Sequence, residues 1–393
     1  MDRNKIIVKH PEIVGDNTLK CSFSCSKKLE SFFKEKVLWV KFNRKIKGVP
    51  KSLLAIPLLS NILPIAWASD ADVHVEEIDS QFLRSAEIVR NSFQALYPKL
   101  KFRGKIYAKS IVETRGYNKQ KSAALFSGGV DSITTYIRKR QEGPGLITVW
   151  GSDIAHTNDK SWKLVKQNNL NFGKQNKVSN LFLQTNFRSM INYKKLINKF
   201  SLNWWGNIQH GYALLGLCAP ISYIEGIKTL YIPSTYSNKL PDYPWGSHPS
   251  IDVNVKWGET SVVHDGYELT RQDKLNVISE YIRSEDPSLQ IRVCWKSSGG
   301  KNCSHCEKCS KTMVGLYLAG VDPNRHGFTM NKRTLDNIKV KFLQKWKFSK
   351  GDKYHWEYIQ KSVSRNKSNI PHEYAEFFSW LEKVDISKIP VIK

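Results

Sequence analysis

The segment at residues 127–132, Ser-Gly-Gly-Val-Asp-Ser, has the composition of an anion-binding loop. The apolar run before it predicts a buried strand, and a helix is expected to begin near Ser132. Successive N–H groups in such a loop and at the helix N-terminus can hold a phosphate, and glycines at 128 and 129 let its oxygens approach the main chain. The hydroxyls of Ser127 and Ser132 add donors. No Gly-Lys-Ser/Thr follows, so this is not a Walker loop, and the remaining alternative is an ordinary turn.

Four cysteines further along the chain have the spacing C-x8-C-x2-C-x2-C. Four thiolates suit tetrahedral Zn²⁺ and leave no open coordination position, so we predict a structural zinc site formed by Cys294, Cys303, Cys306 and Cys309. Nearby charges are expected to offset the negative charge of this site, from Lys301, Lys308 and Lys311. The alternatives are a disulfide pair or buried free thiols. The polar start of the chain predicts a cytoplasmic protein, in which stable disulfides are disfavoured. Three further cysteines are interpreted as structural, namely Cys21, Cys25 and Cys218.

Together, the two motifs resemble those of the PP-loop (N-type) ATP pyrophosphatases, and their separation is similar to that in the 7-cyano-7-deazaguanine synthase branch of queuosine biosynthesis. The resemblance covers roughly residues 121–320. It implies an α/β fold of the adenine-nucleotide alpha hydrolase type, with a parallel sheet flanked by helices. Further strands are expected at 145–154, where the family places adenine, and at 178–185 and 229–235.

The same resemblance implies that the site binds ATP with Mg²⁺. The pyrophosphate part of ATP is then expected to lie on Ser127, Gly128, Gly129, Val130 and Ser132. Asp131 would either orient a Mg²⁺-bound water or cap the helix. Residues 270–274 correspond to a family segment that opens a helix, so Arg271 or Lys274 is expected to reach a phosphate. The predicted catalytic residues are Asp131, Ser132 and Arg271.

The implied chemistry is adenylation by an ATP-dependent carbon–nitrogen ligase. A carboxylate oxygen attacks the α-phosphorus of ATP, pyrophosphate leaves, and a nitrogen nucleophile resolves the acyl-adenylate to an amide or, after a second activation, a nitrile. Catalysis would depend mainly on positioning and charge neutralisation. The family's substrate segment departs here, because residues 242–250 retain only Tyr243 and Pro244. The acceptor is therefore not carried over, and redeployment in an anti-phage or specialised modification pathway is one expectation.

Two other functions remain open. A tRNA-modifying PP-loop enzyme is favoured by the net charge of +26, although the cysteines leave no obvious persulfide carrier for thiolation. A non-catalytic nucleotide-binding partner protein is the other, and the intact loop argues against it. Basic clusters at 159–200 and 339–367, the second rich in aromatics, could contact RNA or form solvated and core surfaces. The expected partners are a small-molecule or protein carboxylate, with tRNA and a homodimer as alternatives.

The 393 residues are expected to form three units. Residues 1–115 predict an N-terminal α+β accessory domain, with strands near 19–26, 37–42, 71–77 and 105–112 and a helix at 80–97. Residues 120–320 form the nucleotide-binding domain with the zinc site, and 321–393 form a basic helical extension. The apolar stretch 53–67 is broken by prolines and too short to span a bilayer, so it predicts core and no membrane span. The tryptophans at 204 and 205 could stack a purine or fill the core.

Overall fold

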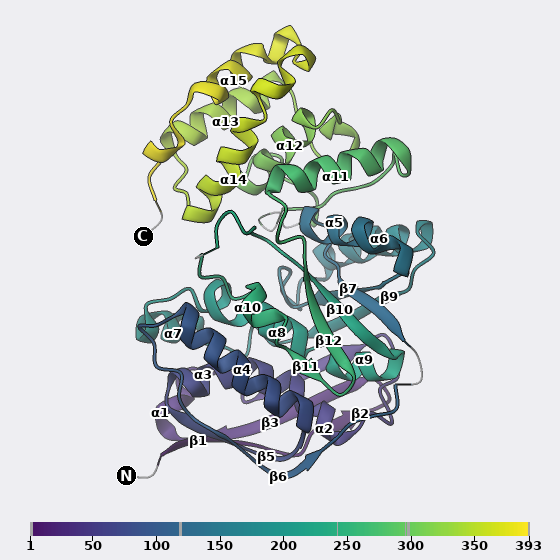
Figure 1. Cartoon of the computed structure of the whole chain (residues 1–393), viewed down its shortest axis with the longest axis vertical. Helices are drawn as coiled ribbons and strands as arrows, with labels where there is room; N and C mark the ends of the chain where they lie inside the picture. The colour runs from purple at the N-terminus through teal and green to yellow at the C-terminus, as the bar shows by residue number, and fades with distance from the viewer. Residues whose placement is uncertain (1–2, 118–119, 242, 295, 297–298, 392–393) are drawn as a thin grey trace.

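The computed structural model describes residues 3–117, 120–241, 243–294, 296 and 299–391. Among them, twelve strands form one large mixed sheet in the order β11-β12-β10-β7-β8-β9-β4-β3-β1-β5-β6, with β2 paired to β3. Helices flank the sheet, and the C-terminal helices form a separate layer above it (Figure 1). The expected α/β class, with mostly parallel strands between helices, is confirmed.

Five parallel strands form the centre of the molecule: β7 (Lys121–Leu125), β8 (Gly145–Trp150), β9 (Asn180–Thr185), β10 (Ile227–Pro233) and β12 (Thr260–Asp265). The first of them, β7, lies inside the sheet, with β8 and β9 on one side and β10 and β12 on the other. Their side chains are largely buried, as expected for parallel strands covered on both faces. The strands that follow β7 in the sequence are therefore added first on one side of it and then on the other. Folds of this type bind ligands at the carboxyl edge where this change of side occurs.

Helices connect these strands or follow the last of them. They are α5 (Val130–Lys139), α6 (Asp159–Gln175), α7 (Tyr193–Phe200), α8 (His210–Gly216), α9 (Ala219–Glu225), α10 (Pro249–Asp252) and α11 (Arg271–Ser284). The short strand β11 (Lys256–Trp257) pairs with β12. Predicted strand positions agree with the structure, but β8 ends at Trp150, four residues before the expected end, because Gly151 turns the chain with φ +118°. This early end frees residues 151–154 to form a loop at the carboxyl edge.

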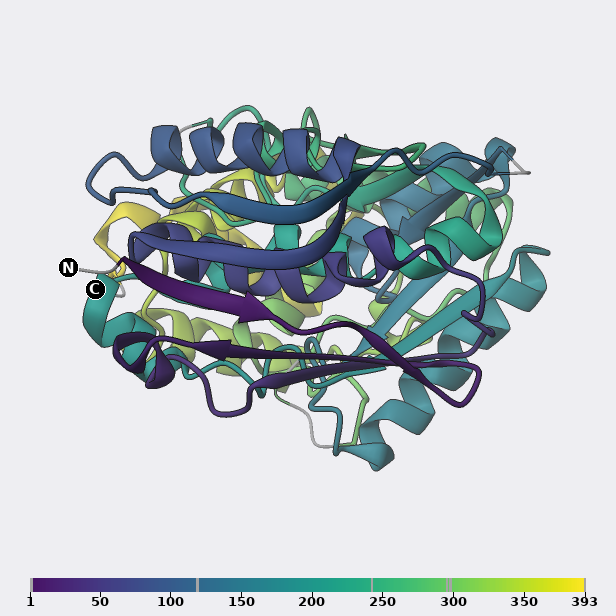
Figure 2. The same cartoon turned by 90° about the horizontal axis from the view of Figure 1, so that it is seen from below.

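The N-terminal strands extend the same sheet. They are β1 (Asn4–Val8), β2 (Glu12–Val14), β3 (Thr18–Cys25), β4 (Val37–Phe42), β5 (Ala71–Asp79) and β6 (Ile106–Val112), and β4 pairs antiparallel with β9. Helices α1 (Lys27–Glu30), α2 (Lys51–Leu54), α3 (Ile56–Ala68) and α4 (Ser80–Leu96) accompany them, and in Figure 2, seen from below, these strands face the viewer. The apolar stretch 53–67 is buried as expected, mostly within α3. One hydrophobic cluster reaches from Ile6 to Val262, so residues 1–115 and 120–265 share a core.

The C-terminal part is helical, as predicted. It contains α12 (Glu307–Leu318), α13 (Lys332–Gln344), α14 (Lys350–Lys361) and α15 (His372–Lys383), which share a second hydrophobic cluster with α5 and α11. The aromatics Phe342, Phe348 and Trp356 are fully buried in it, so these rings form core and cannot stack on bases. None of the helices among the described residues combines the length and the apolar character needed to cross a membrane.

Candidate functional site

The loop at residues 127–132 joins β7 to α5, whose N-cap is Gly129. Ser132 closes the loop on itself: its Oγ accepts a hydrogen bond from the backbone N–H of Ser127 (3.2 Å) and donates one to the carbonyl of Gly129 (3.0 Å). Gly128 has φ +74°, and a Cβ there would lie 2.9 Å from Asn169 Oδ1, so this position requires glycine. The predicted strand–loop–helix is therefore present, with the helix beginning two residues earlier than expected, at Val130.

Asp131 is held by the two cations predicted at the start of α11. Arg271 Nη1 lies 3.1 Å and Lys274 Nζ 3.2 Å from Asp131 Oδ1, and Lys274 also donates to the carbonyl of Ser234. Burial raises the pKa of Asp131, but the charges of Lys274, Arg271 and Lys308 outweigh it and hold that pKa below its usual range. The capping box of Thr270 and Asp273 begins α11 where the sequence placed a helix start. In this structure both cations bind Asp131, and their contact with a phosphate remains a prediction.

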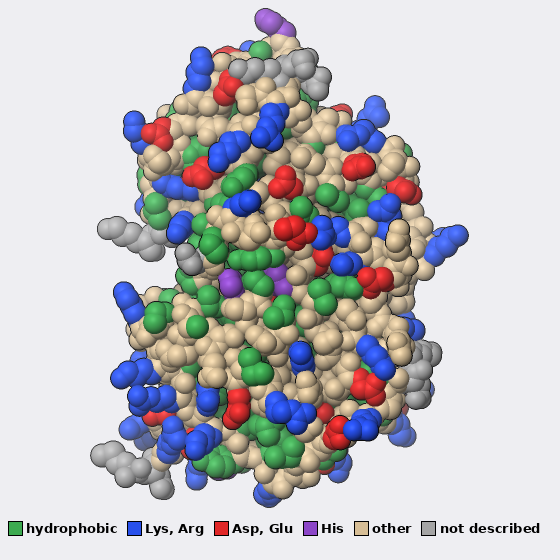
Figure 3. All heavy atoms as spheres, in the orientation of Figure 1, with side chains coloured by type: hydrophobic (Ala, Val, Ile, Leu, Met, Phe, Trp, Pro, Cys, Tyr) green, Lys and Arg blue, Asp and Glu red, His purple; other side chains and the backbone are tan. Residues whose placement is uncertain are grey.

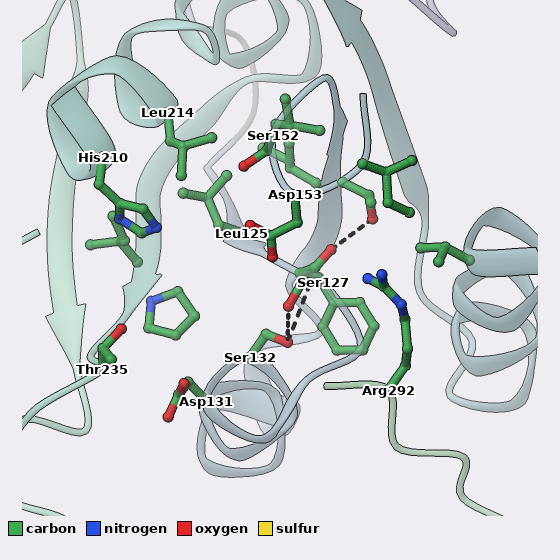
Figure 4. A pocket seen from close by; sticks show the side chains of 18 of the residues that line it. Leu125, Ser127, Asp131, Ser132, Ser152, Asp153, His210, Leu214, Thr235 and Arg292 are labelled. Atoms are coloured by element: carbon green, nitrogen blue, oxygen red, sulfur yellow. Dashed lines mark hydrogen bonds between the residues drawn. The ribbon is translucent and has the colours of Figure 1, made fainter. Parts of the chain in front are cut away.

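A cavity opens at the carboxyl ends of β7, β8 and β10 (Figure 4). One side is apolar and is formed by Ile147, Val149, Ile154, Trp162 and Val165. Polar and charged residues line the cavity at several other points, namely Ser127, Asp131, Ser132, Asp153, His210, Arg292 and Lys308, and Figure 4 shows His210 and Arg292 at opposite ends of the view. The cavity lies where the strand order reverses, beside the loop. An apolar wall next to an anion-binding loop is the combination that a nucleotide requires.

The four predicted metal ligands come together. Their sulfur atoms all lie within 4.8 Å of one another, and the pairs Cys294–Cys306 and Cys303–Cys309 each have Sγ atoms 3.9 Å apart. These distances exclude disulfides, and all seven cysteines are free. Tetrahedral coordination with metal–sulfur bonds near 2.3 Å requires sulfur atoms about 3.8 Å apart. The cluster could therefore bind a metal ion such as zinc.

Comparisons of the chain with models of protein families, with curated proteins and with solved structures found no match. The chemistry of the site must therefore be inferred from its own geometry.

Sequence reasoning missed Asp153, because it placed this residue inside a strand. The loop after β8 instead brings Asp153 into the cavity, with its carboxylate turned toward Ser127 and Ser132 (Figure 4). Among the described residues, Asp153 has no hydrogen bond or ion pair. Desolvation raises its pKa, but the positive charges around it, above all that of Lys308, lower it below the usual range. Asp153 is thus an ionised carboxylate that faces the loop without a partner.

His210 is a second residue whose place only the structure reveals. It follows a π-helical turn at Trp205–Gln209, a type of turn frequent at functional sites, and its Nδ1 is buried without a hydrogen-bond partner. Burial lowers its pKa to about 4. Of the two tryptophans predicted either to stack a purine or to fill the core, Trp204 is fully buried and Trp205 packs 4.0 Å from the Arg188 guanidinium. His210 therefore presents a neutral imidazole to the cavity.

The low pKa of His210 predicts acid sensitivity. The unfolded chain takes up this proton near pH 6.5 and the folded chain near pH 4, so the unfolded state binds more protons between these values. We expect the free energy of unfolding to fall by up to about 1.4 kcal/mol per pH unit as the pH drops through this window. Urea unfolding at pH 7, 6 and 5 measures the slope. His210→Gln should flatten it, and replacement of the exposed His10 should not; an equal slope in both variants would refute the assignment.

The expected substrate segment lies beside the cavity rather than in it. Asp242 is outside the described residues, and Tyr243 packs against Tyr236, 4.4 Å between ring centroids. His248 caps α10 by accepting a hydrogen bond from the backbone of Ser250, so it has a structural role here. Beneath it, His264 Nδ1 and Asp252 Oδ2 form a fully buried pair at 2.8 Å. The cavity is lined instead by Pro233 and Thr235, which precede this segment in the sequence.

Proposed function

We propose that the chain is an ATP-dependent adenylating ligase that activates a carboxylate for bond formation with nitrogen, in the manner of the 7-cyano-7-deazaguanine synthases. The observation that carries the proposal is the cavity itself: a glycine-containing anion loop at a helix N-terminus lies at the reversal point of a parallel sheet, between an apolar wall and free charges. This is the chemistry needed to hold adenine and a triphosphate together.

Each part of the cavity has a place in this proposal. The loop N–H groups and the hydroxyls of Ser127 and Ser132 hold the β- and γ-phosphates, and the apolar wall accommodates adenine. Mg²⁺, when bound, neutralises phosphate charge, and hard oxygen ligands suit it. The carboxylate that faces the loop without a partner is Asp153, so we assign it to the metal, whereas Asp131 braces the loop through α11.

The reaction proceeds in two displacements. A carboxylate oxygen of the substrate attacks the α-phosphorus, and the bond to pyrophosphate breaks. A nitrogen nucleophile then attacks the activated carbonyl carbon, and AMP leaves with the bonding electron pair. Lys308 and Arg292 lie where they would neutralise phosphate charge, and the neutral His210 offers Nδ1 as a hydrogen-bonding group for the acceptor.

The metal of the four-cysteine cluster is proposed to be a structural Zn²⁺. Sulfur ligands at tetrahedral separation suit zinc, and with four of them no position remains for substrate or water. A tRNA substrate is supported mainly by the net charge, because most aromatics of the second basic cluster are in the core and only Trp346 and Tyr358 are partly exposed. On the face in Figure 3, lysine and arginine side chains are spread widely, with acidic side chains among them.

The test is pyrophosphate release from ATP and Mg²⁺ with 7-carboxy-7-deazaguanine as the first carboxylate offered. We expect carboxylate-dependent release, and a fall of at least about a hundredfold in Asp153→Asn, because a positioned charge in the transition state is lost. Asp159→Ala, which removes an exposed carboxylate at the start of α6, is the matched control and should retain full activity.

Pyrophosphate release that does not depend on the deazaguanine would be consistent with adenylation and would show that the substrate is another carboxylate. Bound ATP without any release, across a panel of carboxylates, would refute the ligase and favour a nucleotide-binding protein.

A further inference from the structure

Residues close in sequence to the first and the last cysteine of the cluster line the nucleotide cavity. Arg292 lies two residues before Cys294, and Lys308 lies between Cys306 and Cys309; both side chains line the cavity. The sequence suggested only that Lys308 offsets the charge of the metal site. The structure instead places this lysine between the cysteine cluster and the polar side of the cavity.

Arg292 joins the cluster to the anion-binding loop. Its backbone N–H donates to the carbonyl of Gly128 at 2.9 Å, so the segment before Cys294 supports the loop directly. Its guanidinium donates to the carbonyls of Cys294 (2.7 Å) and Gly300 (3.2 Å), within the segment that links the first two cysteines. In Figure 4 the guanidinium extends toward the loop side of the cavity. The main-chain positions of Cys294 and Gly300 therefore fix where this charge lies.

Lys308 depends on the cluster through α12. Cys306 is the N-cap of this helix and its backbone N–H donates to Cys303 Sγ at 3.3 Å, so the first turn begins on the cluster. Lys311, one turn later, forms ion pairs with Glu307 (3.1 Å) and Asp352 (3.2 Å). Lys308 differs from it, since among the described residues no carboxylate lies within ion-pair distance. Its charge is therefore free for a ligand in the cavity.

A metal ion would fix the segment before Cys294 and the start of α12 relative to each other. Residues 299–306 contain no regular secondary structure, and the cysteine sulfurs are their common attachment point. Metal binding in such small units supplies the free energy that orders the chain. Without the metal, the start of α12 and the loop that receives the Arg292 guanidinium lose this attachment, and both charges lose their fixed positions beside the phosphates.

We propose that the cysteine cluster and the nucleotide site are thermodynamically coupled through Lys308 and Arg292, so that metal binding strengthens nucleotide binding and the nucleotide retains the metal. The inference rests on the proposed nucleotide site. Linkage requires that the coupling be reciprocal: if the metal tightens nucleotide binding by some factor, the nucleotide tightens metal binding by the same factor. The effect on the metal can therefore be measured without any catalytic assay.

The experiment follows zinc transfer from the zinc-loaded full chain to the chromophoric chelator 4-(2-pyridylazo)resorcinol. It is run with and without α,β-methylene-ATP and Mg²⁺, and binding of the analogue is measured in parallel by equilibrium dialysis. With the transfer followed to equilibrium, we expect saturating analogue to raise the affinity of the chain for zinc at least about tenfold, within the usual range of coupling between sites. Lys308→Met, which keeps the aliphatic stem, should retain one zinc per chain and reduce this protection to less than about threefold.

Lys332→Met is the matched control, because Lys332 is an exposed lysine at the start of α13, outside the cysteine segment, and it should retain the full protection. Analogue that binds without raising the zinc affinity would overturn the coupling and leave the nucleotide site standing. Protection that persists unchanged in Lys308→Met would overturn the role of this lysine. Failure of the wild-type chain to bind the analogue would overturn the nucleotide site, and the coupling with it.

Discussion

Cys309→Ser is expected to weaken metal binding at least a hundredfold and to lower the stability of the folded chain. Removal of a group that only hydrogen-bonds to a metal ligand already costs about 10–100-fold in metal affinity, and a direct ligand contributes more. Since the ion stabilises only the state that binds it, a hundredfold weaker affinity at saturating metal lowers the free energy of unfolding by about 2.7 kcal/mol. Metal content by elemental analysis and urea unfolding of the zinc-loaded chain measure the two effects. Cys309 is fully buried in the first turn of α12, where it belongs to the second hydrophobic cluster.

Cys25→Ser is the control, because Cys25 is a half-buried cysteine outside the cluster. This variant should keep one metal ion per chain and nearly unchanged stability. A Cys309→Ser protein that kept its metal at full affinity would show that the four sulfurs do not form the site. Chelation of the wild-type metal should reproduce the loss of stability seen in Cys309→Ser.

Asp131→Ala is expected to lower the free energy of unfolding by about 3 kcal/mol, because it leaves two buried cations without their shared carboxylate. The side chains of Arg271 and Lys274 are only 3% and 2% exposed, so water cannot solvate them well when the carboxylate is gone. Urea or thermal unfolding without nucleotide measures the loss. Asp159→Ala is again the matched control, since Asp159 occupies the first turn of α6 in an exposed position, and a change below about 1 kcal/mol is expected there.

The double variant Asp131→Ala, Lys274→Met separates charge from packing. Replacing a buried ion pair by apolar groups of similar size is often nearly neutral, so the second substitution should recover part of the loss caused by the first. Losses that simply add would show that Lys274 and Asp131 do not depend on one another. The comparison uses stability alone, so it does not require the ligand to be known.

Local patterns were sufficient for the two motifs. The loop at 127–132 and the cysteine spacing each lie within a short stretch, and the structure forms a strand–loop–helix at the first and a cluster of sulfurs at the second. The capping box at Thr270 and the strands of the central sheet follow equally from nearby residues. The end of β8 did not, because the strand was expected to continue to Ile154, whereas Gly151 turns the chain away. Because the strand ends earlier than expected, Asp153 lies in a loop at the cavity, and the sequence pattern did not indicate this position.

By itself, the sequence determined the α/β class, the anion loop and the four sulfur ligands, since each depends on residue types at fixed local spacing. Only the tertiary structure decided which charges meet at the cavity. Asp131 contacts Arg271 and Lys274, which are 140 and 143 residues away in the sequence. Asp153, His210 and Lys308 come together because three parallel strands end at one edge and α12 packs over it. Distances between such residues are set by packing, which no local pattern records.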